Sequence, residues 1–224
     1  MRERPIRLKA HEVRAILSGV KTQTRLVVKP QPPAGHKFAG FTTYSTHRAD
    51  EGKAVWAAGE VRAALIDAHR VACPFGQPGD RLWVKETTVR VEEHGYIGPV
   101  YVASQEGQDV INWGLAPAPD DCTDVEPYEI KLRPSIHMPR SMCRLVLEIT
   151  DVRVERLQAI SAADAEAEGL RKFPFEDSNA WAWRDGDRCG HASPTGAFRS
   201  LWTSTGGDWD ANPWVWVISF RRLP

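Results

Sequence analysis

The sequence is short of cysteine and of long apolar runs, and each shortage excludes a class of protein. The four cysteines stand apart without a C-x-x-C pair, which excludes a disulfide framework and a zinc ribbon. Cys189 and His191 lack the further partners that a metal site needs, so we expect neither a metal nor a cofactor. No run of about 18 apolar residues occurs, and the start lacks the apolar segment of a secretory signal. We therefore expect a cytoplasmic protein without a membrane partner.

Net charge is also missing, because 29 basic residues balance 29 acidic ones. A chain without net charge has no global field of the kind that drives salt-dependent, sequence-blind binding to nucleic acid. Any contact with a polynucleotide must therefore be local. The 224 residues, of which 42% are hydrophobic, are enough to bury a sizeable core.

The pattern of apolar residues predicts both helices and strands. Apolar side chains at the spacing i, i+3, i+4 and i+7 predict a helix at about residues 10–18, which Gly19 would end. A β-prone run begins at Arg81, and residues 144–157 alternate apolar and polar side chains as in a long or bent strand. The run at 213–223 is also strongly β-prone. This order predicts an α+β fold with a barrel-like sheet.

A second helix is predicted directly after the long strand. Ser161 begins a capping-box pattern, good helix formers follow, and Gly169 supplies the stop. Three insertions, near 30–70, 90–130 and 171–212, are rich in turn-forming residues and are interpreted as mostly long loops, with a candidate strand at 98–103 and a candidate short helix around 198–203. No internal repeat occurs, so we expect residues 1–224 to form one domain with these insertions.

The densest group of polar residues, Lys21, Thr24 and Arg25, follows the first predicted helix. In an extended strand, positions three apart face opposite sides, whereas a turn brings all three side chains to one face. A threonine hydroxyl becomes a nucleophile when a base takes its proton, and a desolvated lysine can serve as that base. Taken alone, the pattern is more typical of a solvated connecting loop, since charged side chains normally stay exposed.

Further candidates lie on the predicted strands and on a basic stretch. Trp83 is the aromatic side chain that we expect beside a bound base, and Glu86 is a candidate carboxylate at the end of the same strand. A basic stretch with prolines could hold a phosphate backbone or could equally be a polar loop. Its members are Lys131, Arg133, His137, Arg140 and Arg144.

Four motifs, in this order, resemble the ASCH family. They are G-x-K-T-x-T at 19–24, the Pro-Gly-Asp turn at 78–80, LEITDVRVERLQAISAADAEAEG at 147–169 and the closing strand at 214–222. The segments GQPGDRLWVKE, RPSIHMPR and ANPWVWVISFRR resemble the phage- and prophage-encoded members. The resemblance implies a PUA-like β-barrel with flanking helices and long loop insertions.

The resemblance also implies a function. Some ASCH proteins are bacterial amidohydrolases that remove the acyl group of N4-acetylcytidine without a metal, and their lysine, threonine and glutamate match Lys21, Thr24 and Glu168. Arg25 would bind the base carbonyl or the oxyanion. Since a close carboxylate raises the pKa of a lysine, Lys21 acts as a base only where burial outweighs Glu168.

Two alternatives stay open. The first is a noncatalytic PUA-like module that recognises a modified nucleobase or structured RNA through the same pocket and the basic stretch. The second is a ribonuclease, which is less favoured because no histidine pair is placed to carry out acid–base chemistry on phosphate. The expected partner is therefore a nucleoside or modified base, with RNA as the alternative.

Overall fold

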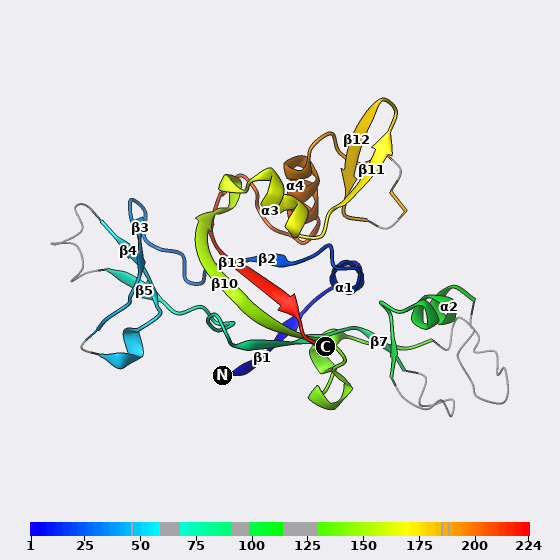
Figure 1. Cartoon of the computed structure of the whole chain (residues 1–224), viewed down its shortest axis with the longest axis horizontal. Coiled ribbons are helices and arrows are strands. Elements are labelled where there is room, and N and C mark those ends of the chain that lie inside the picture. The colour runs from blue at the N-terminus through cyan, green and yellow to red at the C-terminus, as the bar shows by residue number, and fades with distance from the viewer. Residues whose placement is uncertain (46, 59–67, 91–98, 114–129, 185, 188) are drawn as a thin grey trace.

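The computed structural model describes residues 1–45, 47–58, 68–90, 99–113, 130–184, 186–187 and 189–224. Its main element is a five-stranded sheet in the order β1-β6-β10-β13-β2 (Figure 1). The strands are β1 (Glu3–Arg7), β6 (Arg81–Lys85), β10 (Val146–Arg156), β13 (Trp214–Arg222) and β2 (Gln23–Val27). β1 runs parallel to β6, and the other neighbours are antiparallel. With the helices below, this sheet confirms the α+β class.

The two long strands, β10 and β13, are strongly curved (Figure 1). Their pairing shifts register between Ile149 and Asp151, and such a bulge bends a strand. Within the described residues no pairing joins the edge strands β1 and β2, so the hydrogen-bonded sheet is open. The α+β prediction is confirmed, and the closed PUA-like barrel stays a prediction.

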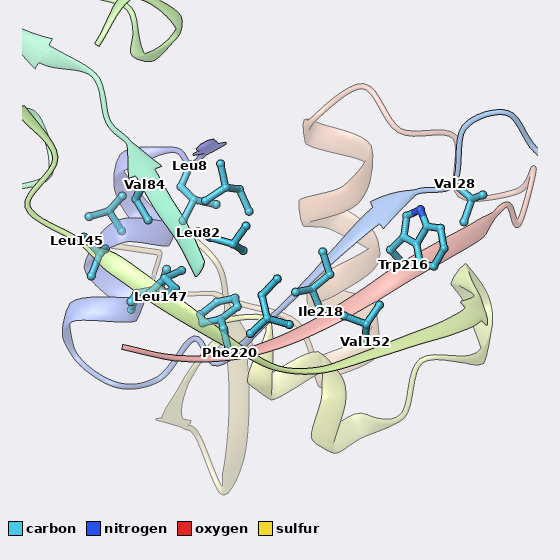
Figure 2. Close-up of a cluster of buried hydrophobic side chains, with 14 of the residues drawn as sticks. Leu8, Val28, Leu82, Val84, Leu145, Leu147, Val152, Trp216, Ile218 and Phe220 are labelled. Carbon is cyan, nitrogen blue, oxygen red and sulfur yellow. The ribbon is translucent and has the colours of Figure 1, made fainter. Parts of the chain in front are cut away.

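One face of the sheet, the core face, carries the largest hydrophobic cluster (Figure 2). Strand alternation puts Leu82, Leu147 and Ile218 on this face, each at most 1% exposed. The predicted first helix is α1 (Ala10–Leu17), and its Val13 and Ile16 pack into the same cluster. The spacing of apolar residues in the sequence therefore identified the helix and two of its buried residues, whereas Leu17 and Val20, which have the same spacing, are exposed.

The opposite face of the sheet, the helix face, is covered at the β2 edge by two helices. Val215 and Val217 pack there with residues of α3 (Ala162–Ala167) and α4 (Pro194–Ser204). Beside these helices lies the hairpin of β11 (Arg171–Phe175) and β12 (Ser178–Ala182) (Figure 1). The short helix expected around 198–203 is confirmed by α4, whereas the expectation of a loop at 171–182 is wrong, because a regular hairpin forms there.

Two further small sheets lie in and next to the other predicted insertions. One is β3 (Lys37–Phe41), β4 (Ala54–Ala57) and β5 (His69–Val71), and the other is β8 (Val100–Tyr101), β7 (Thr88–Val89) and β9 (Leu132–Arg133). The described chain also holds α2 (Gln105–Trp113) and short 3-10 turns at Arg48–Asp50, Ser135–His137, Arg140–Met142 and Leu157–Ala159. No helix among the described residues is both long and apolar enough to cross a membrane.

Tertiary contacts explain why these segments are regular. Trp56 of β4 is fully buried, and its ring centroid lies 6.0 Å from Trp214 and 6.4 Å from Trp216 of β13. In α2, a Cβ on Gly107 would lie 2.0 Å from the carbonyl oxygen of Tyr101, so only glycine allows this close packing. The composition of these segments is typical of loops, so the sequence did not predict elements that are stabilised by long-range packing.

Candidate functional site

Lys21 and Glu168 form the centre of a buried ion cluster. Lys21 Nζ donates to Glu168 Oε2 at 3.0 Å and to the carbonyl oxygen of the same residue at 2.9 Å. Glu12 Oε1, on α1, lies 3.5 Å from the same nitrogen. The side chains of Lys21 and Glu168 are only 1% and 3% exposed. Segments far apart in the chain therefore bring an ammonium between two carboxylates.

Local structure at both ends explains this meeting. Gly19, at φ +78°, ends α1 and turns the chain toward β2. Thr22 N then donates to the Ala167 carbonyl oxygen at 2.9 Å, which ties the start of β2 to the end of α3. At the start of α3, Ser161 Oγ accepts from the backbone N–H of Asp164 at 3.1 Å, so the predicted cap is confirmed.

Arg25 is the second cation of the cluster, and its side chain is fully buried. Its guanidinium contacts Glu168 Oε1 at 3.3 Å, Glu155 Oε2 at 3.1 Å and Asp164 Oδ2 at 3.3 Å. It also donates to the side-chain oxygen of Gln23. Within the described part of the chain, its Nε has no hydrogen-bond partner. Among the described residues, this cluster therefore has one buried donor that is not satisfied.

The cluster carries more acidic than basic side chains. Its cations are Lys21, Arg25 and Arg153, and its carboxylates are Glu12, Glu155, Asp164 and Glu168. A fifth carboxylate, Asp151, faces Arg153 at the exposed rim, 3.5 Å away. An excess of negative charge around a buried site disfavours anionic ligands.

Electrostatics assign the proton in the Lys21–Glu168 pair. Burial by itself lowers the pKa of Lys21, but attraction to Glu168 and Glu12 outweighs burial and raises that pKa above its usual value. Burial raises the pKa of Glu168, and the charges of Lys21 and Arg25 offset only part of this rise. In this arrangement Lys21 is a cation at neutral pH, and Glu168 is the group of the pair that accepts a proton.

Thr24 lies on the other side of β2 from Arg25. β2 is an extended strand in which Arg25 pairs with Val217 on the helix face, whereas Thr24 pairs with Ile218 on the core face. Thr24 is buried at 5% exposure. The structure therefore brings Lys21, Arg25 and Glu168 together, but it directs Thr24 to the opposite face.

Trp83 and Glu86 lie elsewhere on the sheet. β6 is separated from β2 by β10 and β13, and three strand spacings amount to about 14 Å. Lys85 Nζ is 5.4 Å and Arg140 Cζ is 5.8 Å from the Trp83 ring centroid. Glu86 is 2% exposed and forms a bidentate pair with Arg144, at 3.0 and 2.8 Å. The structure therefore does not bring these two candidates to the ion cluster.

The predicted basic stretch is largely engaged within the protein. Arg140 forms a bidentate pair with Glu3, at 3.0 and 2.9 Å, and Arg144 is paired with Glu86 as described above. Arg133 contacts Thr88 Oγ1 at 3.5 Å, whereas Lys131 and His137 are exposed. Two of the five predicted phosphate-binding side chains are thus neutralised by carboxylates.

The sequence did not point to five side chains of the cluster, which are Glu12, Gln23, Arg153, Glu155 and Asp164. Glu12 contacts Lys21, Gln23 and the other two carboxylates contact Arg25, and Arg153 pairs with those same two carboxylates. Alternation within the β2 and β10 segments puts Gln23 with Arg25, and Glu155 with Arg153, on common faces. That signal became useful only with the strand pairing, which the sequence does not contain.

Cysteine and metal chemistry add no further site within the described residues. There, no group of three or more histidine, cysteine, aspartate or glutamate side chains is arranged to hold a metal ion. Cys73, Cys143 and Cys189 are free thiols, and Cys122 lies outside the described residues.

No protein-family model, no curated protein and no solved structure matches this chain. The likeness to the ASCH family therefore depends on the motifs quoted above. The geometry of the ion cluster is the main support for a functional argument.

Gly169 allows the close approach of Lys21 to α3. Its φ is +98°, and a Cβ there would lie 2.9 Å from Lys21 Cβ and 3.0 Å from Ala15 Cβ. We expect Gly169→Ala to lower the free energy of unfolding by about 2–3 kcal/mol. Gly206→Ala is the matched control, because Gly206 also has a positive φ, +84°, but no atom within 4 Å. Urea denaturation of both variants measures the difference, and equal losses would contradict the contact.

Asp164 links the cluster to the stability of the protein at acidic pH. Burial by itself raises its pKa, but hydrogen bonds from Gln23, Ser161 and Arg153 outweigh burial and lower that pKa to about 2. Since an unfolded aspartate titrates near pH 3.9, this carboxylate stabilises the fold above about pH 4, and the contribution is lost as the pH falls toward 2.

We therefore expect Asp164→Asn to be less stable than the parent by about 1 kcal/mol at pH 7, since the group is partly exposed. The difference should vanish near pH 2. Urea denaturation across this range measures it, with Asp210→Asn as the control because that side chain is 83% exposed. A deficit that persists unchanged at pH 2 would contradict the assignment.

Proposed function

We propose that this chain is a metal-independent amidohydrolase that removes the acyl group from an N4-acylated cytosine nucleoside. The observation that carries the proposal is the buried pair of Lys21 and Glu168, joined at 3.0 Å, with Arg25 beside it. Charged groups are rarely this deeply buried, and such perturbed pairs occur preferentially at functional sites. The resemblance to ASCH amidohydrolases, with its PUA-like barrel, supports the same function.

The cluster contains groups for two tasks of amide hydrolysis, stabilisation of the oxyanion and transfer of a proton. A nucleophile adds to the acyl carbon, the carbonyl oxygen becomes an oxyanion, and the bond to the exocyclic nitrogen then breaks as that nitrogen gains a proton. The Lys21 ammonium and the free Arg25 N–H stabilise the oxyanion. Glu168, whose pKa is raised, takes the proton that the nucleophile loses and passes it to the leaving amine, which departs as neutral cytidine. The acyl group leaves as the carboxylic acid, directly if water attacks or after water hydrolyses the ester formed on a threonine.

The nucleophile is the part of this mechanism that rests on the resemblance, which assigns it to Thr24. Thr24→Ser retains a hydroxyl, whereas Thr24→Val has a similar shape without one. If Thr24 attacks the acyl carbon, serine retains measurable activity and valine loses it. Hydrolysis by Thr24→Val at the parent rate would instead identify the nucleophile as water held by Glu168.

The acidic excess of the cluster selects for a substrate without phosphate. A nucleotide or RNA would bring further negative charge toward Glu12, Glu155 and Asp164, whereas a nucleoside brings none. The proposal therefore names the free nucleoside as the substrate.

The experiment compares N4-acetylcytidine with its 5′-monophosphate and follows the release of cytidine or its nucleotide by chromatography. We expect turnover of the nucleoside, with kcat/KM at least about 10-fold above that of the monophosphate. Failure to hydrolyse either compound would refute the amidohydrolase proposal. Faster hydrolysis of the monophosphate would refute the selection against phosphate.

A second candidate function is binding of single-stranded RNA at the other end of the helix face. Strand alternation puts Arg7, Arg81 and Lys85 on this face around Trp83, and Arg140 also lies against that ring. Aromatic rings with neighbouring cations bind bases and backbone together. RNA affinity that falls steeply with salt and is lost in Trp83→Ala, without any hydrolysis, would favour this function over the amidohydrolase.

A further inference from the structure

The β11–β12 hairpin starts just after Glu168 and carries two tryptophans on one side of β12 and its continuation. The hairpin is fixed by five cross-strand pairs, from Arg171–Ala182 to Phe175–Ser178. Trp181 is held further by two backbone hydrogen bonds with His191, at 2.9 and 2.8 Å. The positions of the two indole rings are therefore well determined by the backbone.

The first ring contacts the helix that ends at Glu168. Trp181 Nε1 donates to Glu166 Oε1 at 3.1 Å. Glu166 belongs to α3, and Glu168 is the C-terminal cap of that helix. Because α3 has only six residues, a bond to its last turn constrains the position of the cap as well.

The second ring contacts the helix that carries Glu12. The Trp183 ring lies 5.4 Å from the His11 ring on α1, and His11 directly precedes Glu12. Trp183 Nε1 also donates to Ser200 Oγ of α4 at 3.2 Å. Trp183 therefore connects α1 to α4.

Two of the helices that the tryptophans contact each provide a carboxylate to the ammonium group of Lys21. Lys21 Nζ is held by Glu168 from α3 and by Glu12 from α1, and the hairpin contacts both helices. We propose that the β11–β12 hairpin is a positioning element, in which Trp181 and Trp183 hold α3 and α1 so that Lys21 stays between its two carboxylates. The effect on catalysis rests on the proposed function, but the effect on Lys21 does not.

The protonation of Lys21 reports on this positioning. The charged groups that face Lys21 are Glu12 from α1 and Glu168 from α3, with Arg25 of β2 on the far side of Glu168. Burial alone lowers the pKa of Lys21, and the two carboxylates raise it. If the carboxylates move away while Lys21 stays buried, Lys21 must therefore titrate at a lower pH.

The experiment follows the titration of Lys21 by NMR in the full chain, with the Lys21 signal assigned from Lys21→Arg. Trp181→Phe and Glu166→Leu remove the same hydrogen bond from either side, and Trp183→Leu removes the ring contact with His11. We expect each variant to lower the titration midpoint of Lys21 by roughly half a pH unit. Glu166→Gln retains an acceptor oxygen and should restore the parent midpoint.

The matched control is Trp209→Phe, since Trp209 belongs to the same aromatic cluster but packs on Phe198 and Arg199 of α4. Its Lys21 midpoint should equal that of the parent. In the hydrolysis assay, Trp181→Phe should lower kcat several-fold with KM within about two-fold. Unchanged Lys21 midpoints in all three test variants would overturn the positioning role. If the Lys21 midpoints shift but the protein hydrolyses no substrate, the positioning role of the hairpin is supported and only the amidohydrolase proposal is refuted.

Discussion

Replacement of Glu168 by alanine is expected to lower the free energy of unfolding by about 3 kcal/mol at pH 7. The carboxylate accepts from Lys21 at 3.0 Å and from Arg25 at 3.3 Å, and these two cations are 1% and 0% exposed. Its removal leaves buried positive charge with fewer partners, and burial of an incompletely paired charge is costly. Urea denaturation monitored by tryptophan fluorescence measures the loss.

The control for this prediction removes both charges of the pair. In Lys21→Met with Glu168→Leu, side chains of similar volume replace the ions, and exchange of a buried ion pair for apolar residues is often close to neutral. We expect this double variant to recover most of the stability lost by Glu168→Ala. A loss below about 0.5 kcal/mol in Glu168→Ala, typical of a surface position, would show that the pair is not buried.

Lys21→Met is expected to lower kcat/KM for N4-acetylcytidine by about 10³-fold, because it removes a buried cation from the site of the developing oxyanion. The side chain lies between Glu168 and Glu12 and stays protonated at neutral pH. Methionine retains most of its length and volume without the charge. Initial rates of cytidine release across a range of substrate concentrations measure the effect.

Arg156→Met is the control for a cation outside the cluster. Arg156 lies over the Trp214 ring at 4.4 Å and donates to the Asn212 carbonyl oxygen at 3.1 Å. Its kcat/KM should stay within about two-fold of the parent value. If kcat/KM of Lys21→Met lies within ten-fold of the parent value, the proposed role of the ammonium in stabilising the oxyanion is wrong.

Elements with strong local signals could be predicted from the sequence. Helix α1 has a clear apolar face, β10 alternates on either side of its bulge, and the Ser161 cap forms as the pattern indicates. These signals depend on neighbours within one or two turns. Local patterns therefore identified the helix, the central strand and the turn that lead into the ion cluster.

Elements stabilised by distant contacts could not be predicted in this way. β11 contains Pro174 and has no clean alternation, and it depends on pairing with β12. Helix α2 has little apolar surface, and Val110 and Gly107 are its buried residues. The stabilising partners of these segments lie elsewhere in the chain, so composition alone favoured loops.

The candidate site shows the same division. Lys21, Arg25 and Glu168 were predicted together, and the structure brings them together. Thr24 was predicted to share this site as its nucleophile, which requires the motif to form a turn, but the structure shows β2 to be extended there and directs Thr24 to the opposite face. The positions of Trp83 and Glu86 depended on strand order, because β10 and β13 separate β6 from β2.

The most direct test of the central claim is the rate of N4-acetylcytidine hydrolysis by the charge-free double variant, Lys21→Met with Glu168→Leu, compared with the parent. The variant removes the ion pair while the surrounding fold is expected to remain stable. We expect the parent to release cytidine and the folded double variant to show no rate above the uncatalysed background. Hydrolysis by the double variant at the parent rate would contradict it.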